Sequence, residues 1–167
     1  MVHAQLAIGA ENSGKLVSIV RKEARTIAEQ NKSPWLFIDG PPGIACPVIA
    51  SITGASLALI VVEPTLSGVH DMERVIALTA HFGIPAMVCI NKWELNPKIS
   101  DHIEQSAQSS GASLAGRIHY DRAVTEAQIK ALTVVEHGGQ AAEDIRHVWC
   151  TLEDISKQLE IPAVMHV

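Results

Sequence analysis

The sequence has few cysteines, few aromatic residues and no cluster of basic residues. Its three cysteines, Cys46, Cys89 and Cys150, are far apart, so they form no zinc-binding pattern and no disulfide framework. We expect reduced thiols, as in a cytoplasmic protein. Aromatic residues make up only 4% of the chain and the formal net charge is −5. Both values argue against a nucleic-acid partner, which would need stacking platforms or a basic surface.

Long hydrophobic runs and a leader-like start are missing as well. Gly, Pro, Ser or Glu interrupts each apolar stretch within about a dozen residues, which is too short for a membrane-spanning helix. The first five residues lack the charged start and apolar core of a signal peptide. We therefore expect no membrane span.

The composition that is present is that of a globular protein. Apolar residues make up 47% of the 167 residues and charged residues 19%, which predicts a single domain over residues 1–167. Short apolar runs alternate with helical periodicities. We expect strands at 4–8, 35–39, 57–62, 86–90 and 114–118, and helices at 12–30, 46–53, 67–82, 99–110, 124–132 and 140–159. This alternation predicts an α/β fold with a three-layer, doubly wound and mostly parallel sheet.

A carboxylate and a rigid turn follow the apolar run 35–38. Asp39 is succeeded by Gly40-Pro41-Pro42-Gly43, and ligands of open α/β sheets gather at the carboxyl ends of strands. An aspartate there can hold a water on Mg²⁺, and the N–H of Gly43 can contact a terminal phosphate. The alternative is a turn aspartate that caps its own backbone. The segment suggests a nucleotide-dependent switch.

Two more polar segments follow predicted strands. Asn91 can hydrogen-bond a purine edge while the stem of Lys92 packs beside the ring. The alternative is a polar turn after a strand. Guanine-specific loops place Asp two residues after the Lys, and Glu94 is one methylene longer, so we favour adenine and keep guanine open. The segment Glu63-Pro64 opens a loop whose side chains can meet a nucleotide, a partner subunit or a metal. We expect Asp39 and these two segments to meet at one edge of the sheet.

The segment 9–16 has the spacing Gly-x-x-x-x-Gly-Lys but ends in Leu16. A phosphate loop needs Ser or Thr there to place a hydroxyl on Mg²⁺. Glu11 also puts a negative charge where phosphates would lie. We interpret the segment as a helix start capped by Asn12 or Ser13.

These segments and several others occur in the order in which one protein family has them. They are residues 11–17, 38–44, 46–47, 63–74, 90–92, 95–96, 120–121 and 134–136. Together they resemble the MinD/ParA/Mrp group of deviant P-loop ATPases, and in particular its branch with an inserted ferredoxin domain. The resemblance implies that Asp39 is the Mg²⁺-water carboxylate of the second switch and that Gly43 senses the γ-phosphate. It also implies that Asn91 binds adenine and that the turn at Tyr120 lines the base pocket.

The same resemblance implies ATP and Mg²⁺ as ligands, an ATP-gated homodimer and a possible redox or iron–sulfur partner protein. The family's Lys-rich phosphate loop, its first strand and its Cys-rich ferredoxin-like insert have no match here. The chain thus resembles the C-terminal part of such a domain, an incomplete P-loop NTPase-like fold. [4Fe–4S] clusters would belong only to the missing insert. Without the phosphate loop we expect the isolated chain to be inactive as an ATPase.

In the family, the missing strand lies between those that end at Asp39 and Glu63. We expect one of three outcomes: residues 36–38 pair directly with 59–61, another polypeptide fills the gap, or the chain self-associates there. Two other functions remain open. One is a non-catalytic module that docks a redox or iron–sulfur partner on the helix face 67–74, and the other is a GTP-selective switch.

Overall fold

The computed structural model describes residues 1–4, 14–159 and 165–166. Its helices and strands alternate along the chain as the sequence predicts. They are α1 (Gly14–Gln30), β1 (Trp35–Leu36), α2 (Cys46–Ile52), β2 (Ala58–Val62), α3 (Leu66–His81), β3 (Ala86–Asn91), the 3₁₀ helix η1 (Trp93–Leu95), α4 (Pro97–Ser109), β4 (Ser113–Ile118), α5 (Arg122–Ile129), α6 (Val134–His137), α7 (Gln140–Gln158) and β5 (Met165–His166).

A three-stranded parallel sheet in the order β2-β3-β4 forms the centre of the molecule. Ala58 of β2 pairs with Ala86 of β3, and Met87 of β3 pairs with Ser113 of β4. The central strand β3 is apolar along nearly its whole length, and residues 87–90 are at most 1% exposed. A continuous apolar strand of this kind requires cover on both faces of the sheet.

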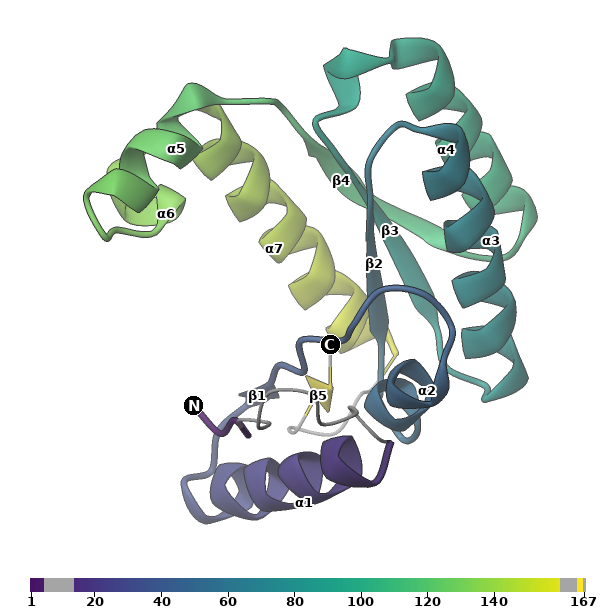
Figure 1. Cartoon of the computed structure of the whole chain (residues 1–167), viewed down its shortest axis with the longest axis vertical. Coiled ribbons are helices and arrows are strands. Elements are labelled where there is room, and N and C mark those ends of the chain that lie inside the picture. Colours follow the sequence, from purple (N-terminus) through teal and green to yellow (C-terminus); the bar gives the residue numbers. More distant parts are fainter. Residues whose placement is uncertain (5–13, 160–164, 167) are drawn as a thin grey trace, which may run out of the picture.

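Helices supply that cover and make three layers. Figure 1 shows α3 and α4 on one side of the sheet and α7 on the other. Because side chains alternate along a strand, Val88 and Ile90 pack with α3 and α4, whereas Met87 and Cys89 pack with the α7 side. The structure confirms the predicted α/β fold with a doubly wound parallel sheet.

The first strand does not join this sheet. β1 pairs in parallel with β5, with Trp35 opposite Met165, and it ends at Leu36 rather than at Asp39. No strand in the described ranges pairs with the second edge of β2. Direct pairing of residues 36–38 with 59–61, one of the three expected outcomes, is therefore wrong. The physical reason is that β1 bonds to β5 instead, which leaves β2 bonded to β3 alone.

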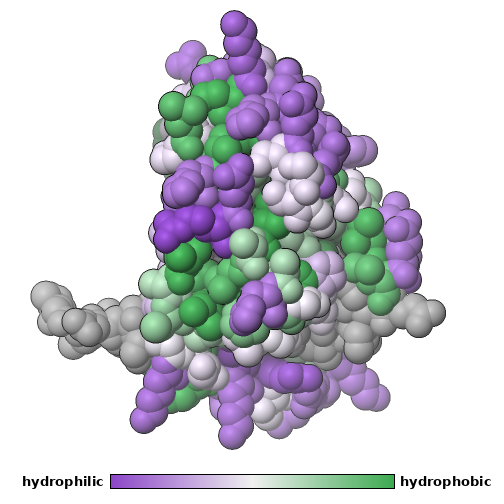
Figure 2. Space-filling view, turned by 90° about the vertical axis from the view of Figure 1, so that its right-hand side faces the viewer, coloured by the Kyte–Doolittle hydropathy of each residue, from purple (hydrophilic) through white to green (hydrophobic). Residues whose placement is uncertain are grey.

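The N-terminal helix α1 lies against α2. The Arg21 guanidinium donates to the carbonyl oxygens of Ala50 (2.6 Å) and Thr53 (2.7 Å), which are unpaired groups at the end of α2. Figure 2 shows the face that carries α2, where apolar side chains gather in the lower middle of the view. The expected strand at 4–8 falls almost wholly outside the described residues.

None of the helices in the described parts of the chain has the length and apolar character to cross a membrane.

Candidate functional site

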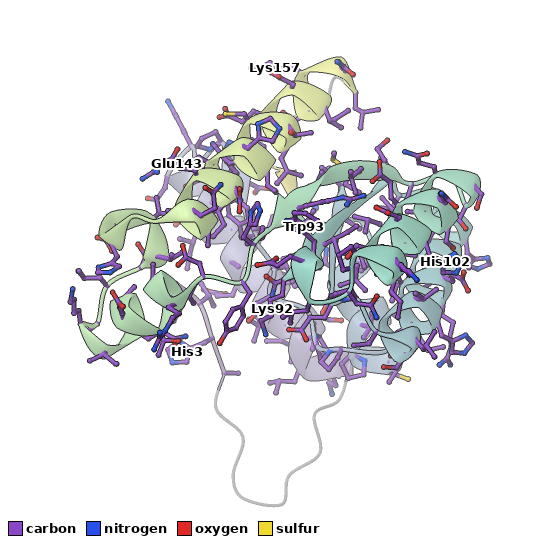
Figure 3. The ribbon with its side chains drawn as sticks, turned by 90° about the horizontal axis from the view of Figure 1, so that it is seen from above. His3, Lys92, Trp93, His102, Glu143 and Lys157 are labelled. Atoms are coloured by element: carbon purple, nitrogen blue, oxygen red, sulfur yellow. The ribbon has the colours of Figure 1, made fainter. Side chains whose placement is uncertain are left out.

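The carboxyl ends of β2 and β3 are joined by an ion pair. Glu63 follows β2 and Lys92 follows β3, and Lys92 Nζ lies 2.7 Å from Glu63 Oε1. This hydrogen bond and the Glu63 charge raise the pKa of Lys92. Figure 3, seen from above this edge, shows Lys92 and Trp93 between α4, which carries His102, and α7, which carries Glu143. The structure thus brings together two of the three polar segments that the sequence places at one edge.

The loop after β3 is also tied to the turn after β4. Asn91, half-buried, is the last residue of β3 and lies opposite Ile118 of β4. The backbone N–H of Tyr120 donates to Glu94 Oε1 at 2.6 Å, while the Tyr120 side chain is 57% exposed. Glu94 Oε2 is buried and has no hydrogen-bond partner among the described residues. Asn91, Lys92 and Tyr120 therefore lie at one edge of the sheet, and Glu94 joins the loop after β3 to the turn after β4.

Behind this edge, aromatic and charged side chains hold the loops in place. Asp144 of α7 accepts the backbone N–H of His119 at 2.9 Å, and its Oδ2 lies 2.8 Å from His119 Nδ1. Burial acts to raise the pKa of Asp144, but these hydrogen bonds outweigh it and hold the pKa below its ordinary value. The Trp93 ring meets His119 edge to face at 5.2 Å and carries the Arg117 guanidinium at 5.5 Å. The sequence offers no local signal for these contacts between loops.

Asp121 connects the amino ends of two helices. Its carboxylate accepts the backbone N–H of Ala123 in α5 at 2.9 Å and that of Ala141 in α7 at 3.1 Å. These two hydrogen bonds lower its pKa from 3.8. Gly139 packs so closely that a Cβ there would lie 2.6 Å from Asp121 Oδ2.

We expect the contribution of Asp121 to depend on pH. A carboxylate whose pKa is lower in the folded state stabilises the protein above its unfolded pKa of 3.8, and this stabilisation is lost as the pH falls through the folded value. The difference in melting temperature between the natural chain and Asp121→Ala should be full at pH 5–7 and should shrink below pH 3.8. The control is Asp154→Ala. It removes an exposed carboxylate whose ion pair with Lys157, at 3.4 Å, contributes little to stability. A difference that stays constant down to pH 3 would contradict this role.

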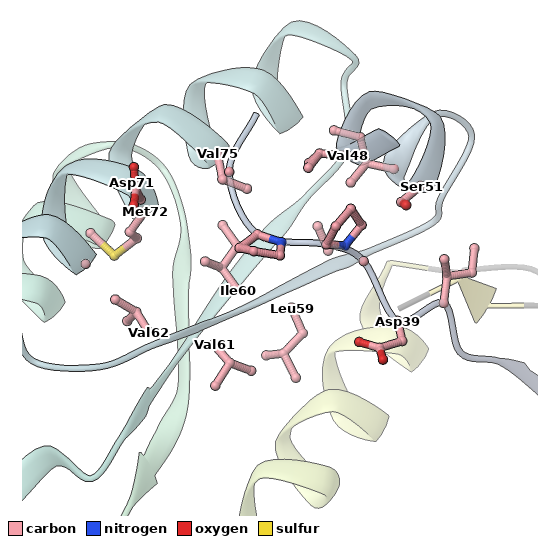
Figure 4. A pocket seen from close by; sticks show the side chains of 18 of the residues that line it. Asp39, Val48, Ser51, Leu59, Ile60, Val61, Val62, Asp71, Met72 and Val75 are labelled. Carbon is pink, nitrogen blue, oxygen red and sulfur yellow. The ribbon is translucent and has the colours of Figure 1, made fainter. Parts of the chain in front are cut away.

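Asp39 lies away from the Glu63–Lys92 pair. It is exposed, in the irregular segment between β1 and α2. Figure 4 shows it on the side of Leu59, apart from Val62 and Asp71 at the carboxyl end of β2. Because β1 is only two residues long and ends at Leu36, no strand carries Asp39 to the common edge. Gly43 follows with φ +89°, a backbone conformation that favours glycine.

A cavity of about 740 Å³ separates the Asp39 segment from β2. Its walls are residues 37–43, all of β2, part of α2 including Val48, and the first turns of α3 including Met72. The lining is mainly apolar (Figure 4), and carboxylates come from Asp39, Glu63 and Asp71. The cavity lies where β1 would need to be if it paired with β2.

The loop after β2 is closely packed at its base and exposed at its tip. Pro64 is buried, so its ring is not available to a ligand in this arrangement. Thr65 caps α3 by accepting the N–H of Gly68 at 2.9 Å. His70 and Asp71 are exposed. Within the described residues, no group of three His, Cys, Asp or Glu side chains is placed to hold a metal ion.

The cysteines contribute no cluster site within the described chain. Cys46 is exposed at the first position of α2. Cys89 is buried in β3, and burial together with the Asp144 charge raises the pKa of its thiol to about 11. A thiol in this state is a small apolar group rather than a ligand.

A parallel sheet covered by helices on both faces is a doubly wound α/β fold, and solved structures of MinD proteins show that this one is P-loop NTPase-like. The cell division ATPase MinD of Pyrococcus furiosus superposes with a TM-score of 0.68 and 16% identity, over 86% of this chain and 59% of that one. The MinD cell division protein of Aquifex aeolicus superposes with a TM-score of 0.65 and 24% identity, over 80% of this chain and 60% of that one. MinD of Pyrococcus horikoshii, solved with Mg-ADP, superposes with a TM-score of 0.68 and 14% identity, over 88% of this chain and 59% of that one. At these identities the likeness shows the fold alone.

No family model matches the chain. Two curated proteins of Methanocaldococcus jannaschii are similar in sequence. The uncharacterized protein MJ0578 is 33% identical over 96 residues, which is 58% of this chain and 33% of that protein. The uncharacterized protein MJ0579 is 29% identical over 97 residues, 54% of this chain and 34% of that protein. The matched segments thus span about a third of these relatives.

Proposed function

We propose that this chain is the Mg²⁺- and base-binding part of a MinD-like ATPase, whose phosphate-binding loop comes from polypeptide outside these residues. The observation that carries the proposal is the convergence of the Glu63–Lys92 pair, Asn91 and Tyr120 at one edge of a P-loop NTPase-like sheet. Ligands of open α/β folds bind at this edge. Asn91 would bond the base, the stem of Lys92 and the ring of Tyr120 would flank it, and the buried Pro64 would hold the loop that follows β2.

Asp39 and Gly43 would serve the phosphate side of the same site. Asp39 is exposed and has no ion-pair partner among the described residues, so its carboxylate is available to a Mg²⁺-bound water. Gly43 would offer its N–H to the terminal phosphate. The P. horikoshii MinD was solved with Mg-ADP, which supports Mg²⁺ and a nucleotide as the ligands of this site. Catalysis would need a cation from the phosphate loop to stabilise developing charge.

The engagement of Glu94 supports adenine over guanine. A guanine-reading carboxylate must be free to accept the N–H groups of the base. One oxygen of Glu94 accepts the Tyr120 N–H and the other is buried, so the carboxylate acts between loops instead. A GTP-selective switch is therefore the weaker proposal.

Nucleotide binding to the 167-residue chain tests the assignment. On titration with ATP and Mg²⁺, we expect NMR shift changes at the amides of Asn91, Lys92 and Tyr120, with no measurable hydrolysis. Asn91→Ala should weaken binding about 3- to 10-fold, the value of one or two neutral hydrogen bonds. The control is Asn31→Ala, because Asn31 is exposed at the end of α1.

Three results would count against the proposal. If Asn91→Ala bound ATP as tightly as the natural chain, Asn91 would not contact the base. Tighter binding of GTP than of ATP would reverse the base preference. Hydrolysis at an ordinary enzymatic rate by the isolated chain would show that no further phosphate loop is needed.

The family resemblance also suggests an ATP-gated homodimer in the complete protein, a ferredoxin-like insert, and work on redox or iron–sulfur proteins. A complex of MinC with MinD from Aquifex aeolicus shows that a protein of this fold can bind a partner. The alternative function, a docking module without catalysis, is favoured by exposed residues on α3: Leu66 is 78% exposed and His70 is exposed. Capture of a partner that survives Asp39→Ala but not His70→Ala would support this alternative.

A further inference from the structure

Two glutamates link the loops at the carboxyl edge of the main sheet. Glu63, after β2, lies 2.7 Å from the Nζ of Lys92, after β3. Glu94, in η1 after β3, accepts the backbone N–H of Tyr120, after β4, at 2.6 Å. Each glutamate thus spans the boundary between two neighbouring strands. Each also bonds a residue that reaches solvent, since the Lys92 side chain is 36% exposed and Tyr120 is 57% exposed.

Lys92 is held at both ends of its side chain. Its φ is +55°, in the left-handed region that residues other than glycine rarely adopt. Its carbonyl oxygen accepts the N–H of Leu95 at 3.1 Å, which fixes this backbone at the start of η1. Residues in such conformations concentrate at binding sites. With the backbone fixed at one end and the ammonium on Glu63 at the other, the four-carbon stem is the part that remains to pack against a ring.

The residues bonded by the two glutamates lie close to each other. The Glu63 hydrogen bond is the main cause of the raised pKa of Lys92, and the Tyr120 phenol adds a smaller effect in the same direction. The second oxygen of Glu94 is buried without a partner among the described residues. Burial of that kind costs free energy, which the bond between the first oxygen and the Tyr120 N–H offsets.

We propose that Glu63 and Glu94 are positioning residues of the base-binding site. Neither would contact the nucleotide. Glu63 would hold the ammonium of Lys92 toward β2, so that the stem rather than the charge faces the base. Glu94 would hold the turn that carries the Tyr120 ring, and the two bonds together would fix the separation of the groups that flank the base. The inference rests on the proposed function, because it takes Lys92 and Tyr120 as those groups.

The opposite role for Glu63 would be to withhold Lys92 from the phosphates. A free ammonium would be attracted to the phosphates of ATP, whereas adenosine carries no such charge. A positioning role predicts that both ligands bind more weakly when Glu63 is removed. A withholding role predicts that ATP binds more tightly and that adenosine binding does not change.

Double-mutant cycles on the 167-residue chain test the Glu63 bond. The Kd is measured by NMR titration, once with ATP and Mg²⁺ and once with adenosine. Glu63→Ala should raise both Kd values about 2- to 5-fold, the range measured for exposed ion pairs. Lys92→Met, which keeps an unbranched stem without the charge, should raise them by a similar factor. The double variant should bind no more weakly than either single variant.

A second cycle tests the Glu94 bond. Glu94→Ala should raise the Kd about 3- to 10-fold, and it should add nothing to Tyr120→Ala, which lacks the ring but keeps the backbone N–H. Glu94→Gln should restore most of the binding, because an amide oxygen still accepts that N–H. Without nucleotide, hydrogen exchange at the Tyr120 amide should be faster in Glu94→Ala than in the natural chain.

Glu143→Ala is the matched control. Glu143 is exposed on α7, on the side of the molecule seen in Figure 3, and it pairs with Arg146 of the same helix. Its removal changes the net charge as much as the other two glutamate substitutions, but it should leave the Kd values unchanged. Melting curves of every variant show whether it is folded at the temperature of the titrations.

Different results would overturn different parts of the inference. Tighter binding of ATP by Glu63→Ala, with unchanged binding of adenosine, would make Glu63 a competitor for Lys92. Additive effects within either cycle would show that the glutamate acts independently of its partner, and would refute its positioning role while the proposed function stands. Failure of the natural chain to bind either ligand would refute the proposed function and this inference together.

Discussion

Replacement of Ile103 by alanine is expected to lower the free energy of unfolding by about 2–5 kcal/mol, as for other large-to-small changes in cores. Ile103 is 0% exposed and packs in the cluster that includes Val88 and Ile90 of β3 and Met72 of α3. The other buried residues of α4, Ser100 and Ala107, are small. The side chain of Ile103 is thus the main apolar anchor of α4, and its loss would leave a cavity against the sheet.

Urea denaturation of the two proteins measures this difference. The matched control is Ile129→Ala, since Ile129 is 80% exposed at the end of α5 and surface changes of this kind usually stay within about 0.5 kcal/mol. Equal effects of the two substitutions would contradict the assignment of Ile103 to the core. The nucleotide contacts that we propose for Asn91 should survive Ile103→Ala under conditions in which the variant remains folded.

The second large effect is expected at Gly68, where α3 passes close to the end of β2. A Cβ on Gly68 would lie 2.5 Å from the Glu63 carbonyl oxygen and 3.0 Å from Thr65 Oγ1. Alanine is otherwise better than glycine in a helix by about 1 kcal/mol. Because the neighbouring atoms are backbone and a capping hydroxyl, overpacking should prevail, and Gly68→Ala should destabilise the protein by about 1–3 kcal/mol.

The substitution should also disturb the candidate site. Any displacement of Glu63 changes its contact with Lys92. NMR would detect this as altered chemical shifts of the residues that follow β2 and β3. Gly40→Ala is the control, since a Cβ there would meet Ser51 Cβ at 3.7 Å, an ordinary contact. If Gly68→Ala proved as stable as the natural chain, α3 could not lie as close to the Glu63 carbonyl oxygen as the structure places it.

The part of the fold that depends on local pattern could be predicted from the sequence. The apolar runs of β2 and β3 and the helical stripes of α3 and α4 fall within a few residues of their expected bounds. The meeting of Glu63 and Lys92 could be predicted too, because parallel strands end at a common edge. A Thr-x-x-Glu capping box, Thr133 to Glu136, was available in the sequence as a signal for α6.

What depends on distant partners could not be predicted. Trp35–Leu36 has the residues of a buried strand, yet its length is set by β5, which lies at the other end of the chain. The position of Asp39 follows from that short strand. The bond from Tyr120 to Glu94 spans 26 residues and that from Ala141 to Asp121 spans 20. No periodicity reports contacts of this kind.

The separation of β1 from the main sheet has a consequence for cooperativity. The two main clusters of buried side chains are built on β2, β3, β4 and the helices that cover them, and β1 reaches the cluster on the α7 side through the half-buried Trp35. Helices α1 and α2 pack chiefly on each other. Partial opening that releases the first two helices should therefore require less free energy than global unfolding. Residues 14–52 would behave as a separate foldon, whose fluctuations expose the flank of a sheet that itself stays intact.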